Sequence, residues 1–560
     1  MQLLKASIHF WVKRDVVMTA LTRVGVASVM TLLGLLQLTT SLDTAPVRSA
    51  LTTAPSLVLH VTSKRKTMKL HGKSEFNIYA TPVVSANGTS VLYNSYATFV
   101  DEGSEFTYTL LDGTAYLTTK GASNVMTVRC LSPSALPFHK ILPALNDVTP
   151  IASASIGKDL VECASGNLFK TSFLGVHYAI CRSGEAGFTA FSSNLDISVE
   201  YLDRPVSIPK PQLPTDGSGS CESIEMATSM TPTALALITG GEIPSSVIRR
   251  LKDFREILNG ILPDEYHMSM QAECEPKSTQ RPCILFHGSG NRREEDELQD
   301  TPVLIPDKLG DIRGYAPFCS SIKYAILNTS DAGWRSGRLQ QKYCDHALSM
   351  SNTSDEATGT IKDTIIVTHS MGGLVMAGAL AKGRCKLSPT TSWVSLSPPM
   401  AGSMASDYLA NACDTNVKIA VKLLEVVGAC PITPGRTSTF RQGEKHMNPS
   451  FDRAYVAAQK AHRHNVAAVI CSDSFLGIFS KYQQALFLTG TILPHKSKKN
   501  DGLVEFESCL GDLDESTFGR SYMDTFYRAE LNHADTAFLS GDGFFRDSQK
   551  PLKWFECLPL

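Results

Sequence analysis

The sequence lacks the cysteine and histidine spacings that hold structural metal ions. None of its 14 cysteines forms a C-x-x-C pair, and none falls into a Cys/His cluster with zinc spacing. It also lacks an excess of charge of either sign, since the formal net charge is -1 and 19% of the residues are charged. The first absence argues against a structural metal site. The second removes the electrostatic case for binding nucleic acid or an acidic ligand.

The N-terminal part holds an apolar run, 24–38, that follows four basic residues. This run has the length of a signal-peptide core and is short for a membrane span. We therefore predict a cleaved signal peptide and leader within residues 1–50. The alternative is a signal anchor over 16–38, which would place Arg23 in the bilayer.

The cysteines are even in number and dispersed, which is typical of disulfide-bonded proteins. Three N-x-S/T sequons, at Asn87, Asn328 and Asn352, agree with a secretory route. These features predict a secreted or extracytoplasmic glycoprotein, with tethering by the signal anchor as the alternative.

Residues 55–203 alternate polar with apolar or aromatic side chains at a period of two, as strands with one buried face do. Asp112-Gly113 is a hairpin turn signal. We predict an antiparallel β domain here, and Cys163 with Cys181 could join two of its strands. The polar face could bind a ligand, but packing on a second domain is favoured. The predicted strand segments are 75–80, 91–99, 105–119, 124–130, 172–181 and 187–201.

Residues 204–220 hold four prolines and then the run Gly-Ser-Gly-Ser, which is typical of a linker. After the linker, helix-like and strand-like segments alternate through 221–560. Such alternation predicts an α/β domain with a parallel sheet and helices on both faces. The predicted helices are 245–258, 336–350 and 374–382, and the predicted strands are 282–286, 322–327, 364–368 and 393–396.

One stretch, 363–374, carries the strongest chemical signal. An apolar, β-branched strand ends at Ser370, and a helical segment follows, in the pattern Thr368-x-Ser370-x-Gly372. A serine held in such a tight turn is exposed to a base and to unpaired backbone N–H groups, as a nucleophile must be. Gly372 and Gly373 would keep Cβ atoms out of the turn and out of the helix–strand contact. The alternative is a chance S-x-G in a buried turn.

A nucleophilic serine needs a histidine base and an acid that orients the histidine. Downstream of Ser370, the turn Asn500-Asp501-Gly502-Leu503-Val504 and the segment Asn532-His533-x-Asp535 are the outstanding candidates. Asp473 is a rival acid, and a surface position is the alternative for His533.

These motifs resemble the C-terminal part of the bacterial true lipases, as do the segments 286–290 and 397–403. The resemblance covers the second domain and implies an α/β-hydrolase fold with a triad of Ser370, Asp501 and His533. It also implies an oxyanion hole formed by the backbone N–H groups of Ser289 and Met371.

The resemblance carries further expectations about neighbouring residues. His287 would order the oxyanion loop, and His369 would point away from the site. Asp535 matches a position that contributes to bound calcium in these lipases, although no second acidic ligand is identifiable here. Cys509 matches half of a disulfide that braces the acid loop, with Cys430 or Cys471 as its partner.

The segment 417–427 is broadly apolar, with one polar stripe at helical spacing. A lid over an apolar pocket and a buried core helix are equally open interpretations. The functional hypothesis is a serine hydrolase that acts on carboxylic esters, with lipid esters favoured, without a cofactor and with transient contact to a lipid interface. Alternatives are an inositol deacylase of GPI-type lipids, a thioesterase, an amidase and an inactive hydrolase-like binding protein.

Overall fold

The computed structural model describes most of the chain after residue 50. The predicted signal segment, the sequon at Asn87, the Gly/Ser part of the linker, Cys430 and the segment 417–427 lie outside the described residues. No helix within the described part is long and apolar enough to span a bilayer. The described residues are 51, 54–86, 88, 90–101, 103–121, 126–132, 135–184, 186–211, 221–224, 230–257, 266–271, 274, 277–414 and 432–560.

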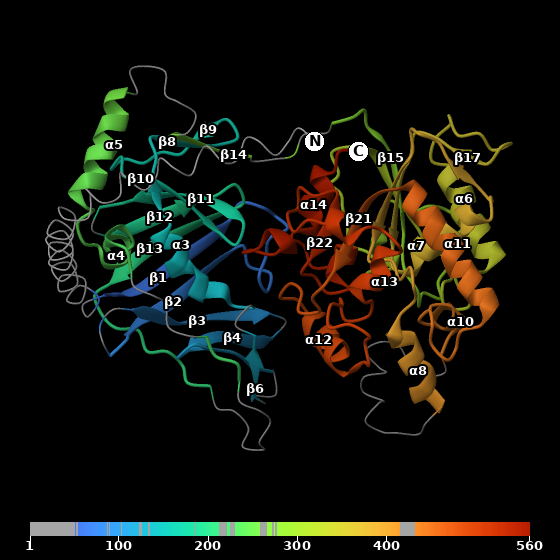
Figure 1. Cartoon of the computed structure of the whole chain (residues 1–560), viewed down its shortest axis with the longest axis horizontal. Helices are drawn as coiled ribbons and strands as arrows, with labels where there is room; N and C mark the ends of the chain where they lie inside the picture. Colours follow the sequence, from blue (N-terminus) through green and yellow to red (C-terminus); the bar gives the residue numbers. More distant parts are fainter. Residues whose placement is uncertain are drawn as a thin grey trace, which may run out of the picture.

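The first half of the chain forms an antiparallel sheet in the order β6-β5-β4-β3-β2-β1-β13-β12-β11-β10-β7 (Figure 1). Its helix α3 (Ile141–Asn146) lies between β6 and β7 in the chain. This confirms the predicted antiparallel β region. The strands are β1 (Ser56–Ser63), β2 (Glu75–Val84), β3 (Val91–Asp101), β4 (Ser104–Leu111), β5 (Thr114–Lys120), β6 (Met126–Leu131), β7 (Thr149–Pro150), β10 (Leu168–Phe173), β11 (Val176–Arg182), β12 (Gly187–Phe191) and β13 (Leu195–Leu202).

Two of the predicted strands are broken by turns. Asp112 and Gly113 have positive φ and form the predicted hairpin turn between β4 and β5. A second turn, at Leu174-Gly175, also has positive φ and divides the predicted strand 172–181 into β10 and β11. The predicted strand 187–201 is divided by Ser192, whose hydroxyl donates to the Leu195 carbonyl and accepts from the Leu195 N–H.

The described parts of 230–270 pack on the antiparallel sheet. They form α4 (Pro232–Thr239), α5 (Ser245–Ile257) and β14 (His267–Met270), which pairs with β8 (Ser153–Ile156), itself paired with β9 (Asp159–Leu160). Apolar side chains of α4 share one buried cluster with side chains of β10 and β11. The predicted division at 220 remains a prediction, but these contacts favour a boundary beyond 270.

The second half of the chain forms a six-stranded sheet in the order β16-β15-β18-β20-β21-β22, in which every neighbouring pair is parallel. The strands are β15 (Arg281–Phe286), β16 (Cys319–Ala325), β18 (Ile365–His369), β20 (Ser392–Leu396), β21 (Val466–Ser472) and β22 (Phe526–Ala529). A separate pair is formed by β17 (Thr360–Ile361) and β19 (Lys386–Leu387).

Apolar clusters cover both faces of the parallel sheet. Ile284 and Ile366 pack with side chains of α6, α7 and α11, while Leu285 and Val367 pack in the cluster that contains α14 side chains. Burial on both faces explains the continuous apolar runs of these strands. The helices are α6 (Gly337–Leu348), α7 (Met371–Ala381), α8 (Met404–Asp414), α10 (Pro434–Thr437), α11 (Pro449–Asn465), α12 (Gln483–Ile492), α13 (Phe506–Leu510) and α14 (Pro551–Cys557).

Six disulfides join described cysteines, which indicates an oxidising compartment. The predicted Cys163–Cys181 bond is present. Cys509 pairs with Cys471, which decides between its two expected partners. The bonds are Cys130–Cys221, Cys163–Cys181, Cys274–Cys557, Cys283–Cys319, Cys344–Cys385 and Cys471–Cys509.

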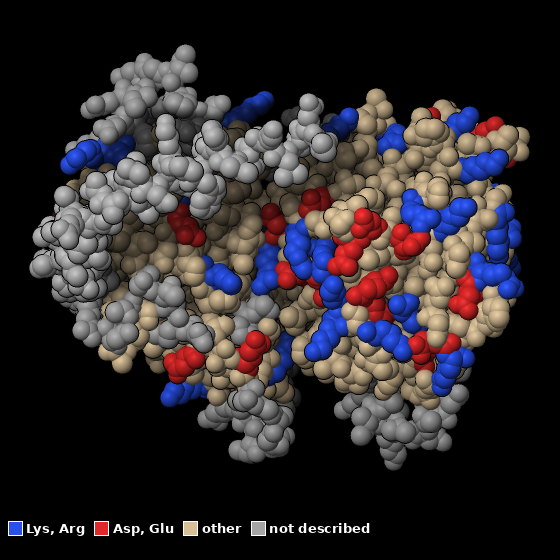
Figure 2. Space-filling view, viewed as in Figure 1, with Lys and Arg blue, Asp and Glu red and all other residues tan. Residues whose placement is uncertain are grey.

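Two of the three sequons lie in the described part of the chain. Asn352 is exposed, whereas Asn328 is half-buried and its amide donates to Asp331 at 2.8 Å. Glycosylation remains a prediction, and the structure favours Asn352 as its site. On the face shown in Figure 2, basic and acidic side chains are interspersed rather than gathered into a field of one sign.

A buried ionic cluster joins the two sheets. Asp542 is fully buried and accepts from Thr67 at 2.8 Å and from Arg65 at 3.3 Å, both in the segment after β1. Its second oxygen accepts from the backbone N–H groups of Leu552 and Lys553 at the start of α14. One carboxylate therefore fixes the first sheet to the last helix.

We expect Asp542→Ala to lower the free energy of unfolding by about 3 kcal/mol or more, since it leaves two buried N–H groups and the Thr67 hydroxyl without their acceptor and leaves Arg65 paired with Glu556 alone. Thermal unfolding of the oxidised protein, followed by circular dichroism, measures the effect. The matched control is Asp300→Ala, which removes an exposed partner of Lys323 and should leave the midpoint nearly unchanged. Equal midpoints for the two variants would contradict the stabilising role of Asp542.

Candidate active site

Ser370 occupies the single residue between the central strand β18 and helix α7. Its backbone has φ 55 and ψ -130, a conformation that costs a residue with a side chain about 1–3 kcal/mol. The Ser370 N–H donates to the carbonyl of Leu396 on β20 at 2.8 Å, which holds the turn in place. Strain of this kind is concentrated at functional sites. The helix begins at Met371, three residues before its predicted start.

Glycines allow the backbone segments around the serine to approach one another. A Cβ at Gly372 would lie 2.9 Å from the carbonyl oxygen of His287, and a Cβ at Gly373 would lie 2.8 Å from Cβ of Pro398. Both distances are shorter than real Cβ contacts. The two glycines therefore have the steric roles that the sequence predicted for them.

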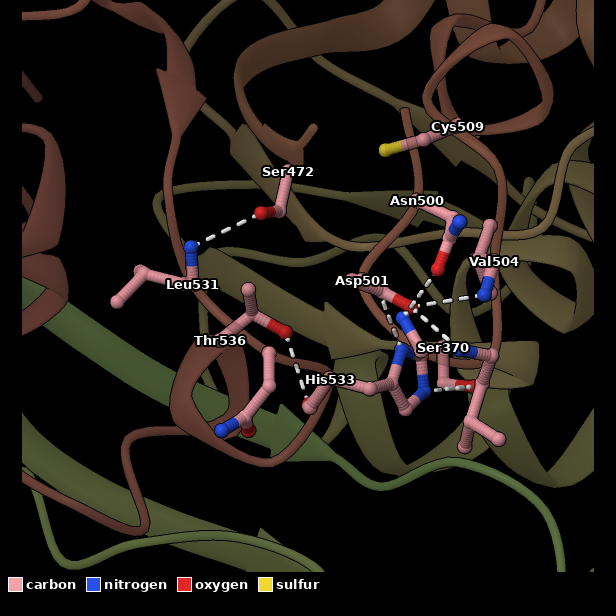
Figure 3. Close-up of polar contacts among 12 residues, drawn as sticks. Ser370, Ser472, Asn500, Asp501, Val504, Cys509, Leu531, His533 and Thr536 are labelled. Carbon is pink, nitrogen blue, oxygen red and sulfur yellow. Dashed lines mark hydrogen bonds and ion pairs between the residues drawn. The ribbon is translucent and has the colours of Figure 1, made fainter. Parts of the chain in front are cut away.

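His533 contacts Ser370, and Asp501 contacts His533, although all three are distant in the sequence (Figure 3). The Ser370 hydroxyl donates to Nε2 of His533 at 3.0 Å, and Nδ1 of His533 donates to Oδ2 of Asp501 at 2.7 Å. Asp501 is 1% exposed and His533 is 8% exposed. The structure thus brings together the three residues that the sequence singled out.

The loop that carries Asp501 is fixed by its own backbone. Oδ1 of Asp501 accepts from the N–H groups of Leu503 at 3.0 Å and Val504 at 2.7 Å, while Oδ2 remains for the imidazole. The Asp501 carbonyl accepts from the His533 N–H at 2.9 Å, so two bonds join these residues. Cys509 in α13 is joined to Cys471 of β21, which anchors the chain just after this loop to the sheet.

The loop that carries His533 is ordered by its flanking polar residues. Oδ1 of Asn532 accepts from the N–H groups of Ala534 and Asp535. The Thr536 hydroxyl donates to the His533 carbonyl at 3.0 Å. These local bonds fix the backbone at His533, and so the direction in which its imidazole points.

His369 does not point away from the site, and that expectation was wrong. It lines the same cavity as Ser370, and its Nε2 donates to the His533 carbonyl at 3.1 Å. Burial, followed by the neighbouring His533, holds the pKa of His369 well below its usual value, so the ring donates a single N–H as a neutral imidazole. The preceding residue, Thr368, lies on the opposite face of β18, where its hydroxyl accepts from the indole N–H of Trp393. Strand alternation therefore directs His369 toward the loop of His533.

The candidate oxyanion groups lie beside the serine. Ser289 and Met371 line the cavity with Ser370, and within the described residues neither backbone N–H donates to an acceptor. A Cβ at Gly288 would lie 2.7 Å from Cβ of Ser370, which shows how closely this loop approaches. His287 is buried, and its Nε2 accepts from the Leu327 N–H at 3.2 Å. Burial lowers the pKa of His287 to about 4, which suits a neutral structural role.

The remaining acidic candidates are engaged elsewhere. Asp473 forms ion pairs with Arg520 at 2.6 Å and Arg528 at 2.7 Å. Oδ2 of Asp535 accepts from the N–H groups of Ile478 at 2.8 Å and Asn532 at 3.2 Å, while its Oδ1 is buried without a hydrogen-bond partner. No cluster of three or more metal-ligating side chains occurs in the described part of the chain. Calcium binding near Asp535 therefore remains a prediction.

A cavity of about 530 Å³ includes Ser370 and His533 in its lining. Much of the remaining lining is apolar and comes from α8, α12, the Asp501 loop and the segment after His533. Lys308, Arg436 and Tyr482 add polar groups that the sequence did not mark, because they belong to no motif. The apolar lining residues are Pro399, Ala405, Leu409, Ala485, Leu486, Leu503, Val504, Ala534, Ala537 and Leu539.

Comparison with known proteins gives little independent support for a functional assignment. No protein-family model matches the chain, and no curated protein matches it. Among solved structures, a lipase from Staphylococcus hyicus is 13% identical, covering 50% of this chain and 94% of the lipase, with a TM-score of 0.27. A likeness this weak carries no argument, so the functional assignment depends on the geometry of this chain's own residues.

Asp535 gives the stability a pH dependence of defined sign. Burial raises its pKa to about 7, against 3.8 for an unperturbed carboxyl. Its contribution to stability is therefore fully present below the unfolded pKa and is lost as the pH rises through about 7. In Asp535→Asn this loss is absent, because the amide does not titrate while its oxygen can still accept both N–H groups.

Chemical denaturation at pH 5 and pH 8 measures the difference. Between pH 5 and pH 8, we expect the free energy of unfolding of wild type to fall by about 2–3 kcal/mol relative to that of Asp535→Asn. One pKa unit corresponds to about 1.4 kcal/mol. The exposed Asp345→Asn is the control and should follow wild type. A wild-type profile parallel to that of Asp535→Asn would show that the carboxyl is already ionised at pH 5.

Proposed function

We propose that this protein is a serine hydrolase of the α/β-hydrolase fold that cleaves carboxylic esters. The observation that carries the proposal is the continuous hydrogen-bonded series from the Ser370 hydroxyl through His533 to Asp501, at 3.0 and 2.7 Å. Nucleophile, base and orienting acid are the parts that acyl transfer to a serine requires. An inactive binding protein would not need these three side chains to be hydrogen-bonded to one another beside an open cavity.

The geometry supports a two-step reaction. His533 Nε2 takes the Ser370 proton as Oγ attacks the ester carbonyl, and the Asp501 carboxylate stabilises the imidazolium through Nδ1. The N–H groups of Ser289 and Met371 would bind the oxyanion. His533 then returns the proton to the leaving alkoxide. Water repeats the sequence on the acyl-enzyme and releases the carboxylic acid.

The apolar side chains of the cavity favour an ester with an acyl chain, and hence a lipid ester. A lipid ester as substrate also implies transient contact between the protein and a lipid interface. The disulfides favour a secretory or extracellular location for this activity. A thioesterase, an amidase or a deacylase of GPI-type lipids would use the same triad, and no feature of the described residues favours these over ester hydrolysis.

We expect a fluorophosphonate probe to label the purified protein, because the probe phosphorylates an activated serine. Ser370→Ala should abolish labelling. Ser349→Ala, which alters a serine at the end of α6 outside the cavity, is the control and should be labelled like wild type. Labelling is read by gel fluorescence, and the modified peptide by mass spectrometry. Absence of labelling in well-folded wild type would favour the inactive binding protein.

We expect Gly288→Ala to reduce kcat for a short-chain p-nitrophenyl ester by about 10²-fold. The added methyl would press on Ser370 and displace Oγ from His533, and displacements of this size have such an effect. Gly121→Ala is the matched control, because a Cβ there meets no atom within 4 Å. Unchanged kcat in Gly288→Ala, at an unchanged unfolding midpoint, would show that the loop is not in contact with the nucleophile.

A further inference from the structure

A second cavity lies in the first half of the chain, between the antiparallel sheet and the helices that cover one of its faces. Strands β1, β2, β3, β12 and β13 line it on one side, and α3, α4 and the 3-10 turn η1 (Pro137–Lys140) line it on the other. Among the described residues, this cavity and the one at Ser370 have no lining residue in common. The proposed hydrolysis makes no use of it.

The lining of this cavity consists mainly of hydrocarbon side chains. Leu57 and Val199 of the sheet share one buried apolar cluster with Leu142 of α3 and Ile238 of α4. No lysine, arginine, aspartate or glutamate belongs to the lining that the described residues form. A charged group placed here would lose its hydration without gaining a counter-ion. The lining therefore favours an uncharged apolar molecule.

Three polar atoms interrupt the apolar lining. The hydroxyls of Tyr93 and Ser95 and Nδ1 of His139 are buried, and none has a hydrogen-bond partner among the described residues. Ser95 is only 3% exposed. Tyr93 and Ser95 are two positions apart on β3, so their side chains lie on the same face of the sheet. Buried polar groups without partners destabilise a fold, so three of them around one cavity indicate a polar group on a bound molecule.

The hydrogen-bonding capacity of these atoms favours a hydroxyl group. Burial, and then the cations Lys140 and Arg546, lower the pKa of His139, so its ring is neutral at pH 7 and Nδ1 can accept a hydrogen bond. The hydroxyls of Tyr93 and Ser95 can donate. An alcohol oxygen accepts two hydrogen bonds and donates one, which complements these three atoms. An ether would leave Nδ1 without a donor, and a carboxylate would be buried without a counter-ion.

The size of the cavity limits the hydrocarbon part of the ligand. About 70 Å³ is open to the centres of water-sized groups. One water molecule takes about 10–15 Å³ of such a space, so about five to seven groups of that size fit. This corresponds to a hydrocarbon chain of about six carbons.

We propose that this cavity binds a small uncharged amphiphile, an aliphatic alcohol of about six carbons, whose hydroxyl is hydrogen-bonded to Tyr93, Ser95 and His139. The binding is non-covalent. The site does not depend on the proposed hydrolysis, so each assignment can fail without the other.

Isothermal titration calorimetry of the purified protein, with its disulfides intact, tests the proposal with three probes. 1-Hexanol has the hydroxyl, its isomer methyl pentyl ether has the oxygen without the O–H, and hexanoate has a carboxylate instead. We expect 1-hexanol to bind with a Kd of about 0.1 mM or lower, which is within the affinity that a ligand of this size can reach. The ether and hexanoate should each bind at least about tenfold more weakly. Equal affinities for 1-hexanol and the ether, or tighter binding of hexanoate, would overturn the proposal.

Variants at the polar atoms separate a ligand site from a loosely packed core. Tyr93→Phe and Ser95→Ala should each weaken 1-hexanol binding about tenfold, since each removes one hydrogen bond in a buried site. Neither should lower the thermal unfolding midpoint of the ligand-free protein, because the deleted atom has no partner among the described residues. Tyr96→Phe, on the same strand but outside the cavity lining, is the matched control and should bind 1-hexanol like wild type.

Two other outcomes would also overturn the proposal. If 1-hexanol binding is unchanged in both Tyr93→Phe and Ser95→Ala, the alcohol binds elsewhere, such as in the cavity at Ser370. If wild type does not bind 1-hexanol and ligand-free Tyr93→Phe unfolds at a lower temperature than wild type, ordered water rather than an alcohol satisfies these polar atoms.

Discussion

The Asp501 carboxylate is the fixed point of the proposed catalytic arrangement. Two backbone N–H groups of its own loop hold one oxygen, and the imidazole of His533 is bound by the other. The Asp501 carbonyl also accepts from the His533 N–H, so the side chain and the backbone of the histidine are positioned by one residue. If this residue were lost, the imidazole would have no partner to select its tautomer, and the strained Ser370 would face an unoriented base.

The rest of the second sheet maintains that arrangement from several directions. Disulfide Cys471–Cys509 anchors the chain beyond the Asp501 loop to β21. The buried Asp535 holds the end of the His533 loop against the Ile478 N–H. His369 supports the His533 carbonyl from β18, the strand that presents the serine. Each support belongs to a different element, so the position of the imidazole depends on the packed domain as a whole.

The sequence predicted those features that depend on local backbone chemistry. A strand, tight turn and helix at Ser370, and polar turns at Asp501 and His533, need particular residues at short spacing, and these leave a readable pattern. The parallel sheet was likewise predicted, because its strands are buried on both faces and alternate with amphipathic helices. Lys308 and Arg436 carry no such pattern, since only the folding of distant segments brings them to the cavity. The breaks at Ser192-Ser193-Asn194 and Leu174-Gly175 were missed because neither contains a proline or a strong turn dipeptide.

The disulfide between Cys274 and Cys557 determines when α14 can be joined covalently to the segment before β15. It joins a residue ahead of β15 to the end of α14, with 283 residues between them. During synthesis Ser370 emerges well before Asp501 and His533, and this bond cannot close until Cys557 has left the ribosome. A nascent chain therefore exposes a serine without its base. The helix α14 can dock and be bonded covalently to the segment between the two sheets only after Cys557 has been synthesised.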